Sequence, residues 1–363
     1  MPISKIQTNS VTTDVLGPGK NLIINGAMQV AQRGTSTSSV TSAAYHLDRF
    51  ETVLSGLGTW TVSQSTTAPT GFSNSLKYEC TTADASPAGG DYLVVYHKLE
   101  GQNLQHLKKG TSSAESVTLS FWVRSNKTGT YQVNLYDLDN TREIGSTYSI
   151  STADTWEHKT ITYSGDTTGA LDNDNAVSLF VEWWLGGGTD YSSGTVPNSW
   201  GTAVNNERNA GGTVNLADST SNNWHITGVQ LELGSQATPF EHRSYGDELA
   251  RCQRYFARID GSVSTVMGLG TAHGLDNDTS TIDLYAPVRP MRASMTVTKS
   301  ANADITVNTA QIASAATNVS FSNQSNHSVR LTIDHAAASG STGGSRLIRF
   351  NKAAAYIHFD AEL

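Results

Sequence analysis

Cysteine and charged residues are both scarce in this 363-residue sequence. Its two cysteines, Cys80 and Cys252, fall in different expected domains, so we expect neither a disulfide between them nor a zinc site. Charged residues make up 15% of the chain, and the net charge is -8 at pH 7. Binding to a nucleic-acid backbone depends on clustered lysine and arginine. The composition therefore argues against nucleic acid as a partner.

Long apolar runs are also lacking. No segment is long enough to span a bilayer, so membrane insertion is not expected. The first 20 residues, MPISKIQTNSVTTDVLGPGK, lack the basic segment and apolar run of a secretory signal. We therefore expect a protein that is made and assembled in a cytoplasm.

Helix-building residues are sparse outside one segment, whereas glycine numbers 32 and serine, threonine and asparagine are abundant. Many short stretches alternate apolar and polar residues, as strands with one buried face do. In SVTLSFWVRSN, for example, Val117, Leu119 and Phe121 share one face, and Thr118 and Trp122 share the other. About nine such stretches between turns predict an all-β, jelly-roll β-sandwich.

The pattern predicts two β-domains joined by a helix. Residues 1–20 form a polar arm that we expect to dock on another protein, and residues 21–243 form the jelly-roll sandwich. A helical rhythm covers residues 244–260. Residues 261–363 alternate again, which predicts a smaller C-terminal β-sandwich-like domain.

The linking helix is amphipathic. Ser244 and Asp247 resemble a capping box at its start. One apolar stripe contains Leu249, Cys252, Phe256 and Ile259. A helix of about three turns is not stable alone. The stripe must therefore pack either on a domain of the same chain or on copies of itself, in which case it is an oligomer interface.

Catalytic motifs are absent from the sequence: there is no GxSxG elbow, HExxH helix, phosphate-binding loop or CxxC pair. Glycosidic hydrolysis needs two carboxylates, and Glu182, beside two tryptophans, is a candidate for one of them. It lies in an alternating strand, however, and an acid beside an aromatic residue is common by chance. We therefore expect no catalytic residues and no enzyme. The stretches LDNDN (Leu171–Asn175) and GLDNDTST (Gly274–Thr281) suit a cation or, more simply, a turn before a strand. No cofactor or metal ligand is expected.

Aromatic residues are the more informative chemistry. Sugars stack their apolar faces on exposed aromatic rings, while amides and carboxylates bind their hydroxyls. Trp184, Tyr191 and Trp200 lie in or beside the long polar segment 186–223, which makes them candidate glycan-binding residues. Packing of this loop onto its own sandwich is the alternative. Trp60, Trp122, Trp156 and Trp224 stand in or beside strands and are expected in the core or on a sheet surface.

Three motifs resemble those of bacteriophage virion proteins of the tail-fibre or receptor-binding type. They are NLIINGAMQVAQRGTS (Asn21–Ser36), AYHLDRFE, which ends at Glu51, and WHITGVQLELGSQATPFEHRSYGDELARCQRYF (Trp224–Phe256). The beginning, PISKIQTNSV, and the end, IHFDAEL, are also similar to the ends of such proteins.

The resemblance implies a sandwich similar to carbohydrate-binding modules, with Asn21–Val30 and Trp224–Leu233 as its first and last strands. Many such modules hold a structural calcium between these strands, but the corresponding places here carry Ala27, Gln29, Thr227 and Gly228 instead of acids. The resemblance therefore does not extend to the calcium.

The resemblance also implies a homotrimer mounted on a phage particle. In such a trimer the helix is the junction of three chains, and Arg251, Arg254 and Arg258 pair with Asp247 and Glu248 of a neighbour.

Three functions are compatible with these observations. The first is a non-enzymatic virion protein, a tail fibre or receptor-binding protein, that attaches to host surface polysaccharide and contacts other phage proteins through its N-terminal arm. The second is a purely structural virion component, such as a head fibre, a capsid decoration or a tail adaptor. The third is a depolymerising enzyme.

Overall fold

The computed structural model describes residues 19–260, 267–274, 279–285, 290–308, 313–322, 324–326, 328–335, 345–350 and 355–363. The expected N-terminal arm, apart from residues 19 and 20, lies outside these ranges. The chain divides into two compact units, Met1–Glu248 with Leu363, and Leu249–Glu362. Among the described residues, no helix combines the length and the apolar character that a membrane span requires. Cys80 and Cys252 are both buried, and no disulfide joins them.

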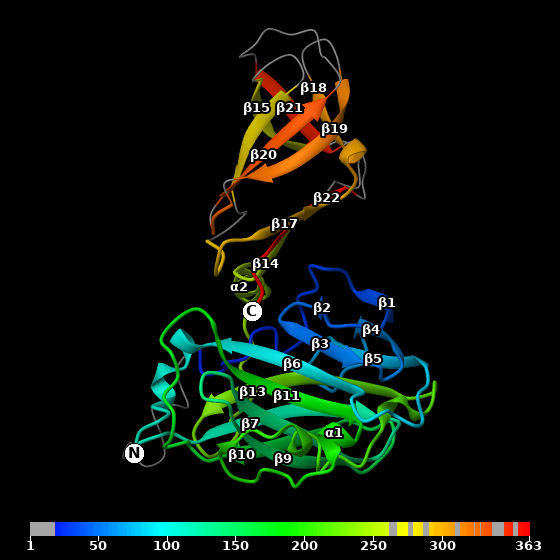
Figure 1. Ribbon diagram of the computed structural model, residues 1–363, viewed down its shortest axis with the longest axis vertical. Helices are drawn as coiled ribbons and strands as arrows, with labels where there is room; N and C mark the ends of the chain where they lie inside the picture. Colours follow the sequence, from blue (N-terminus) through cyan, green and yellow to red (C-terminus); the bar gives the residue numbers. More distant parts are fainter. Residues whose placement is uncertain are drawn as a thin grey trace, which may run out of the picture. The chain divides into compact units, whose positions relative to one another are not determined.

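The first unit is a sandwich of two antiparallel sheets, which confirms the expected jelly roll (Figure 1). The six-stranded sheet has the order β1 (Ser36–Val40), β4 (Thr59–Ser65), β5 (Ser75–Thr82), β13 (Asn223–Leu233), β7 (Val117–Ser125) and β10 (Glu157–Tyr163). The seven-stranded sheet has the order β12 (Gly201–Thr202), β9 (Arg142–Ile150), β8 (Gly129–Asp137), β11 (Val177–Gly187), β6 (Tyr92–Glu100), β3 (Phe50–Ser55) and β2 (Ala44–Leu47).

Apolar residues from both sheets fill the space between them, as the alternation predicts. Phe121 of β7 packs edge-on against Trp183 of β11, with ring centroids 6.0 Å apart. The Tyr78 hydroxyl of β5 lies 2.7 Å from the Thr52 hydroxyl of β3. Trp60 and Trp224 are fully buried in this core.

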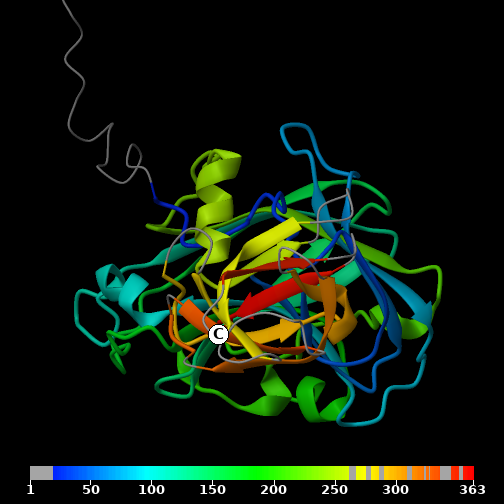
Figure 2. The ribbon, with the colours of Figure 1, turned by 90° about the horizontal axis from the view of Figure 1, so that it is seen from above.

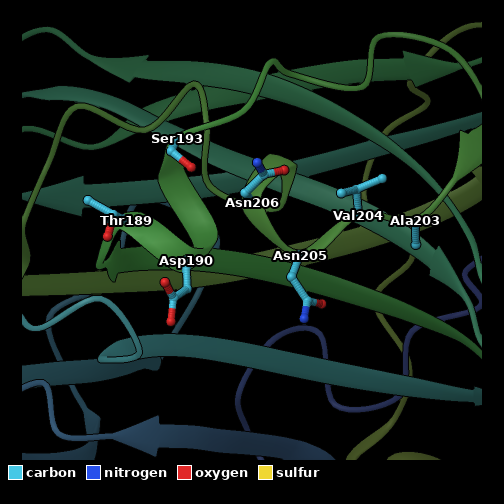
Figure 3. A pocket seen from close by; sticks show the side chains of 7 residues that line it. All are labelled: Thr189, Asp190, Ser193, Ala203, Val204, Asn205 and Asn206. Carbon is cyan, nitrogen blue, oxygen red and sulfur yellow. The ribbon is translucent and has the colours of Figure 1, made fainter.

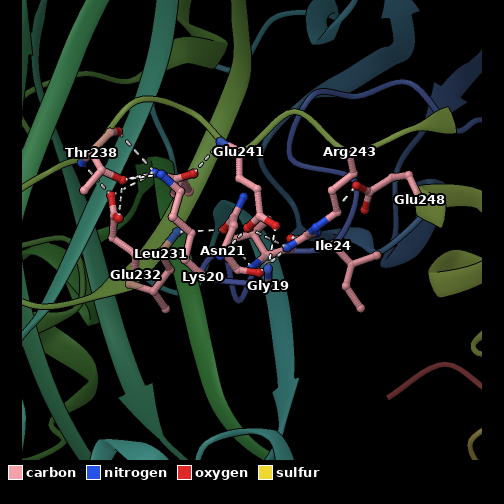
Figure 4. A network of polar contacts seen from close by, with 12 residues as sticks. Gly19, Lys20, Asn21, Ile24, Leu231, Glu232, Thr238, Glu241, Arg243 and Glu248 are labelled. Carbon is pink, nitrogen blue, oxygen red and sulfur yellow. Dashed lines mark hydrogen bonds and ion pairs between the residues drawn. The ribbon is translucent and has the colours of Figure 1, made fainter. Parts of the chain in front are cut away.

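The segment Asn21–Val30 is not the strand that the resemblance implied. It is an irregular segment held against β13 by two backbone hydrogen bonds, Leu22 N to Leu231 O and Val229 N to Gly26 O (both 2.9 Å), and by side chains (Figure 4). The Asn21 amide accepts from Leu231 N (3.1 Å) and donates to Val229 O (3.0 Å). Arg243 donates to the carbonyl oxygens of Asn21 and Ile23. Asn21 therefore joins the segment to β13, and Arg243 joins it to the stretch that follows β13.

The linking helix is shorter than expected. Helix α2 spans Tyr245–Gln253, and β14 (Phe256–Asp260) follows it almost at once. Ser244 caps the helix, since its Oγ accepts from the Asp247 backbone amide (3.2 Å) and donates to Asp247 Oδ2 (2.7 Å). The prediction of one helix through residue 260 is wrong because residues 256–260 pair in full register with β22 (Tyr356–Asp360). Sheet pairing of aromatic and β-branched residues outweighs continuation of the helix here.

The expected interface stripe is divided by this change. Leu249 and Cys252 lie on α2, half-buried and buried, whereas Phe256 and Ile259 lie in a strand. The Phe256 ring packs against His358, with centroids 5.2 Å apart. The four side chains therefore do not form one helical face.

The charges near the helix have partners within the same chain. Glu248 accepts from the Asn25 amide (2.5 Å) and lies 3.5 Å from Arg243. Arg258 pairs with Asp260 in its own strand. The expected pairing of Glu248 and Arg258 with a neighbouring chain is therefore not needed to neutralise them.

The second unit, after the end of α2, is built mainly of strands, and most of them form a barrel rather than two packed layers. The barrel contains β15 (Met267–Gly274), β16 (Thr279–Tyr285), β20 (Ser328–His335), β19 (Ala313–Ser322), β18 (Ile305–Asn308) and β21 (Ser345–Phe350). Figure 2 shows these strands from above in yellow, orange and red. A separate three-stranded sheet contains β14, β22 and β17 (Thr296–Lys299). Ile305, Leu331 and Ile348, on barrel strands β18, β20 and β21, are fully buried.

Candidate functional site

The outer face of the seven-stranded sheet carries polar and aromatic side chains in rows. In one row, Tyr96, Glu182 and Asn134 stand opposite one another on β6, β11 and β8. In the next row, Lys98, Phe180 and Tyr136 are paired in the same way. A polar outward face usually faces water. Glu182 and Asn134, however, are fully buried.

The long segment after β11 covers this face. It contains the short helix α1 (Thr189–Ser192) and strand β12, and its backbone satisfies the polar side chains beneath it. Gln132 donates to Glu207 O (2.9 Å) and accepts from the Gly211 amide (2.7 Å), and Asn134 donates to Arg208 O (2.8 Å). The loop is therefore packed on its own sandwich, which was the alternative that the sequence left open.

Arg208 fixes the loop by its charge. Its guanidinium pairs with Glu182, donates to the Tyr96 hydroxyl (3.1 Å), and lies over the rings of Tyr136 (4.9 Å) and Trp184 (5.5 Å). Burial, and next the Glu182 charge, raise the pKa of Tyr96 well above its ordinary value. Tyr96 is therefore a neutral donor and acceptor in this cluster.

Glu143 of β9 also lies under the loop. Its Oε1 accepts from the Val204 amide (3.1 Å), while Oε2 is buried without a hydrogen-bond partner in the described part of the chain. Burial, with the nearby Glu182 charge, raises the pKa of Glu143 to about 7. An unpaired buried carboxylate is costly, so the neutral form is favoured.

A hollow of about 640 Å³ opens on the outer surface of the loop (Figure 3). Its polar lining consists of two hydroxyls, one carboxylate and two amides, from Thr189, Ser193, Asp190, Asn205 and Asn206. Ala203 and Val204 form its apolar wall, and the Val204 side chain is 45% exposed.

None of the five polar side chains makes a hydrogen bond to another described residue, so their donors and acceptors are open to a ligand. Their backbone is nevertheless fixed: the Asp190 amide donates to Gly89 O (3.0 Å), and the Asn206 carbonyl accepts from Gly194 N (2.8 Å). Figure 3 shows the side chains arising from α1 on one side and from residues 203–206 on the other.

The structure places the three aromatic candidates differently from one another. Trp184 is only 1% exposed, so it cannot stack on a sugar, and that expectation is wrong. It is buried because Arg208 and Tyr191 lie on its ring face. Tyr191 is half-buried against Tyr92 (4.8 Å). Trp200 donates to Ser164 O (2.7 Å) and packs on the core, away from the other two.

The other candidate groups also have structural roles. Glu182 is fully buried and ion-paired, so it cannot reach a glycosidic bond. In LDNDN, Asp174 accepts from the Ala176 amide (2.9 Å), which confirms a turn before β11. GLDNDTST lies partly outside the described residues. Within those that are described, no cluster of three His, Cys, Asp or Glu side chains is arranged to hold a metal ion.

The hollow was missed by sequence reasoning, which had considered only aromatic residues of the loop. The available signal was the density of serine, threonine and asparagine between residues 186 and 223. Because such residues are common in any loop, this signal alone does not distinguish a binding surface from a connection.

Neither a protein-family model nor a curated protein matches this chain. Solved structures overlap with more than half of it. A domain of tailspike protein 4 from bacteriophage CBA120 is 14% identical at a TM-score of 0.31 and covers 60% of this chain, but this chain covers only 22% of that domain. A family 4 carbohydrate-binding module covers 58% of this chain and 99% of its own length, at 11% identity and a TM-score of 0.31.

A family 11 carbohydrate-binding module from Clostridium thermocellum, in complex with a mixed-linked tetrasaccharide, covers 57% of this chain and 99% of its own length. Its identity is 10% and its TM-score is 0.28. The structural neighbours are thus carbohydrate-binding modules and a phage tailspike domain. Overlaps at these TM-scores establish neither a ligand nor a function for this chain.

Proposed function

We propose that this protein is a non-enzymatic phage virion appendage that attaches to a saccharide of the host surface through the hollow in Figure 3. The observation that carries the proposal is the lining of the hollow. Hydroxyl, amide and carboxylate groups beside an aliphatic wall match the alternating polar and apolar surface of a sugar. These groups are held on a backbone that is hydrogen-bonded in place, which reduces the entropy lost on binding.

The charge of the hollow selects among saccharides. Asp190 lines it, and no arginine or lysine does so. An anionic sugar would meet a like charge there. The ligand we propose is therefore a neutral saccharide of a capsule or O-antigen.

The proposed particle context rests on the three sequence motifs. We propose a virion location, docking through the N-terminal arm, and a homotrimer. Leu249 on α2 is half-buried, and we propose that it contributes to the contact between copies. Sedimentation of the purified protein tests the trimer: three copies are expected, and a single copy contradicts it.

An array of bacterial capsule and O-antigen glycans tests the main proposal. The wild-type protein is expected to bind at least one neutral glycan, and Asp190→Ala/Asn205→Ala is expected to bind it about tenfold more weakly. The matched control is Glu115→Ala, which removes an exposed acid paired with Lys108 elsewhere on the sandwich. No binding to any glycan, or equal binding by the double variant, would favour the structural virion component. Release of reducing ends from the bound glycan would indicate the enzyme.

A further inference from the structure

The outer face of the six-stranded sheet carries the two half-buried tryptophans of that sheet. On β7, Leu119, Phe121 and Val123 are buried in the core. Trp122 alternates with them and therefore points outward. Trp156 directly precedes β10, the strand next to β7. Both tryptophans are partly exposed, unlike Trp60, Trp183, Trp184 and Trp224, which are at most 1% exposed.

Histidines lie beside these two rings. His158 of β10 is directly opposite Trp122 in the register, and the two rings are 5.0 Å apart. His225 of β13 lies 5.9 Å from the Trp156 ring. His158 is exposed, so its ring nitrogens can exchange hydrogen bonds with a ligand.

A glycine makes room for a further ring beside Trp122. Gly228 lies at the bulge of β13, with φ of +61°. A Cβ built on it would lie 2.7 Å from Phe72 Cζ and 3.0 Å from Trp122 Cδ1. The absence of a side chain therefore lets both Phe72 and Trp122 lie against the backbone of Gly228. Phe72 in turn packs against Phe240, with ring centroids 5.1 Å apart.

We propose that Trp122, Trp156, His158 and Phe72, here called the tryptophan strip, form a second carbohydrate-binding surface that takes the pyranose rings of a polysaccharide. Indole rings offer the flat apolar surface that the C–H face of a pyranose covers. The neighbouring histidine supplies donors and acceptors at the edge of that surface.

The strip is separate from the hollow in the loop. The hollow lies on the loop that covers the seven-stranded sheet, and the strip lies on the outer face of the other sheet. Because the two outer faces of a sandwich point away from each other, one sugar unit cannot contact both. The strip therefore adds a second attachment point, and two linked sites raise the avidity for a polysaccharide.

Trp122 and Trp156 would also be partly exposed if they only covered the sheet, so the test must detect contact with a sugar. Acrylamide quenches the fluorescence of tryptophans that it can reach. Trp200→Phe removes the partly buried tryptophan of the loop, so that the tryptophans left within reach of acrylamide are those of the strip. Laminarin, xylan, dextran and alginate serve as probes in affinity gels of the full-length chain. We expect at least one of them to retard the protein and to protect the strip from acrylamide.

The matched variants separate the two sites. Trp122→Ala/Trp156→Ala is expected to weaken binding to the retarding polysaccharide about tenfold. Tyr245→Ala removes a tyrosine that is 57% exposed on α2, and this control is expected to leave the affinity for the polysaccharide unchanged. Asp190→Ala/Asn205→Ala reports on the hollow. If only Asp190→Ala/Asn205→Ala loses binding, the proposed function stands, and the proposal that the tryptophan strip binds sugars is wrong.

Two further outcomes would contradict sugar binding by the tryptophan strip. If no probe retards the wild-type protein, or if the retarding probe leaves acrylamide quenching unchanged, the strip does not bind sugars. The quenching measurement uses Trp200→Phe, in which the strip is intact, so it remains decisive even if the double tryptophan variant fails to fold.

Discussion

Replacement of Arg208 by alanine leaves the Glu182 carboxylate buried without its counter-charge. The Glu182 side chain has no exposed surface, and the Arg208 side chain is only 17% exposed. Removing one partner of a buried ion pair costs about 3–5 kcal/mol. The substitution also removes the donor to Tyr96 and the cation above Tyr136 and Trp184. We therefore expect Arg208→Ala to destabilise the first unit by about 3–5 kcal/mol.

Urea unfolding followed by tryptophan fluorescence measures this loss. All seven tryptophans lie before residue 248, so the signal reports on the sandwich and not on the barrel. The matched control is Arg124→Ala. Its partner Asp154, 2.7 Å away, is 55% exposed, and an exposed pair contributes about 1 kcal/mol or less.

A double substitution tests whether the unpaired Glu182 charge causes the loss of stability. In Glu182→Gln/Arg208→Ala no charge remains to be buried, so the double variant is expected to recover part of the stability that Arg208→Ala loses. A double variant that is no more stable than Arg208→Ala would refute the account. A loss below about 1 kcal/mol in Arg208→Ala would also refute it.

Three other predictions concern titration and the N-terminal segment. The pKa of Glu143 is raised to about 7, so its contribution to stability is present below about pH 4.5 and is lost as the pH rises through 7. Glu143→Gln should remove up to about 2 kcal/mol of the difference in stability between urea melts at pH 5 and pH 8. Burial lowers the pKa of His225 to about 3, so the opposite dependence, a loss of stability as the pH falls below about 6.5, should weaken in His225→Gln. Asn21→Ala removes two bonds to β13 and one to Ile23 N (3.0 Å) and should cost about 2–3 kcal/mol, whereas an unchanged melting temperature would show that the segment is not held as described.

The strands were the most predictable part of the fold, because alternation identifies a strand that has one buried face. The pattern in SVTLSFWVRSN corresponds to β7, and Trp224–Leu233 falls within β13. Strand β9 is harder to recognise from the sequence, since Ser146 interrupts the apolar residues of its core face, which are Ile144, Tyr148 and Ile150. Local alternation is a weak predictor where a strand is stabilised mainly by pairing with its neighbour, as β9 is by pairing with β8.

The helix was predictable at its beginning and not at its end. Capping at Ser244 depends on residues within one turn, so the sequence contains it. Its end depends on β22, which lies about 100 residues further along the chain. The spacing of Phe256 and Ile259 fits a helix as well as a strand, and only the pairing partner decides between them.

Burial of the polar sheet face could not be predicted, because alternation tells which residues share a face and not what covers it. Gln132 and Asn134 have the pattern of a solvated face, yet their side chains donate hydrogen bonds to backbone carbonyl oxygens of the loop. The same covering removed Trp184 from contact with solvent. Groups that are already paired cannot bind sugar hydroxyls without breaking those bonds. The sugar binding that we propose must then use the surface of the loop or the opposite sheet, and the loop surface can change in sequence without altering the sandwich beneath it.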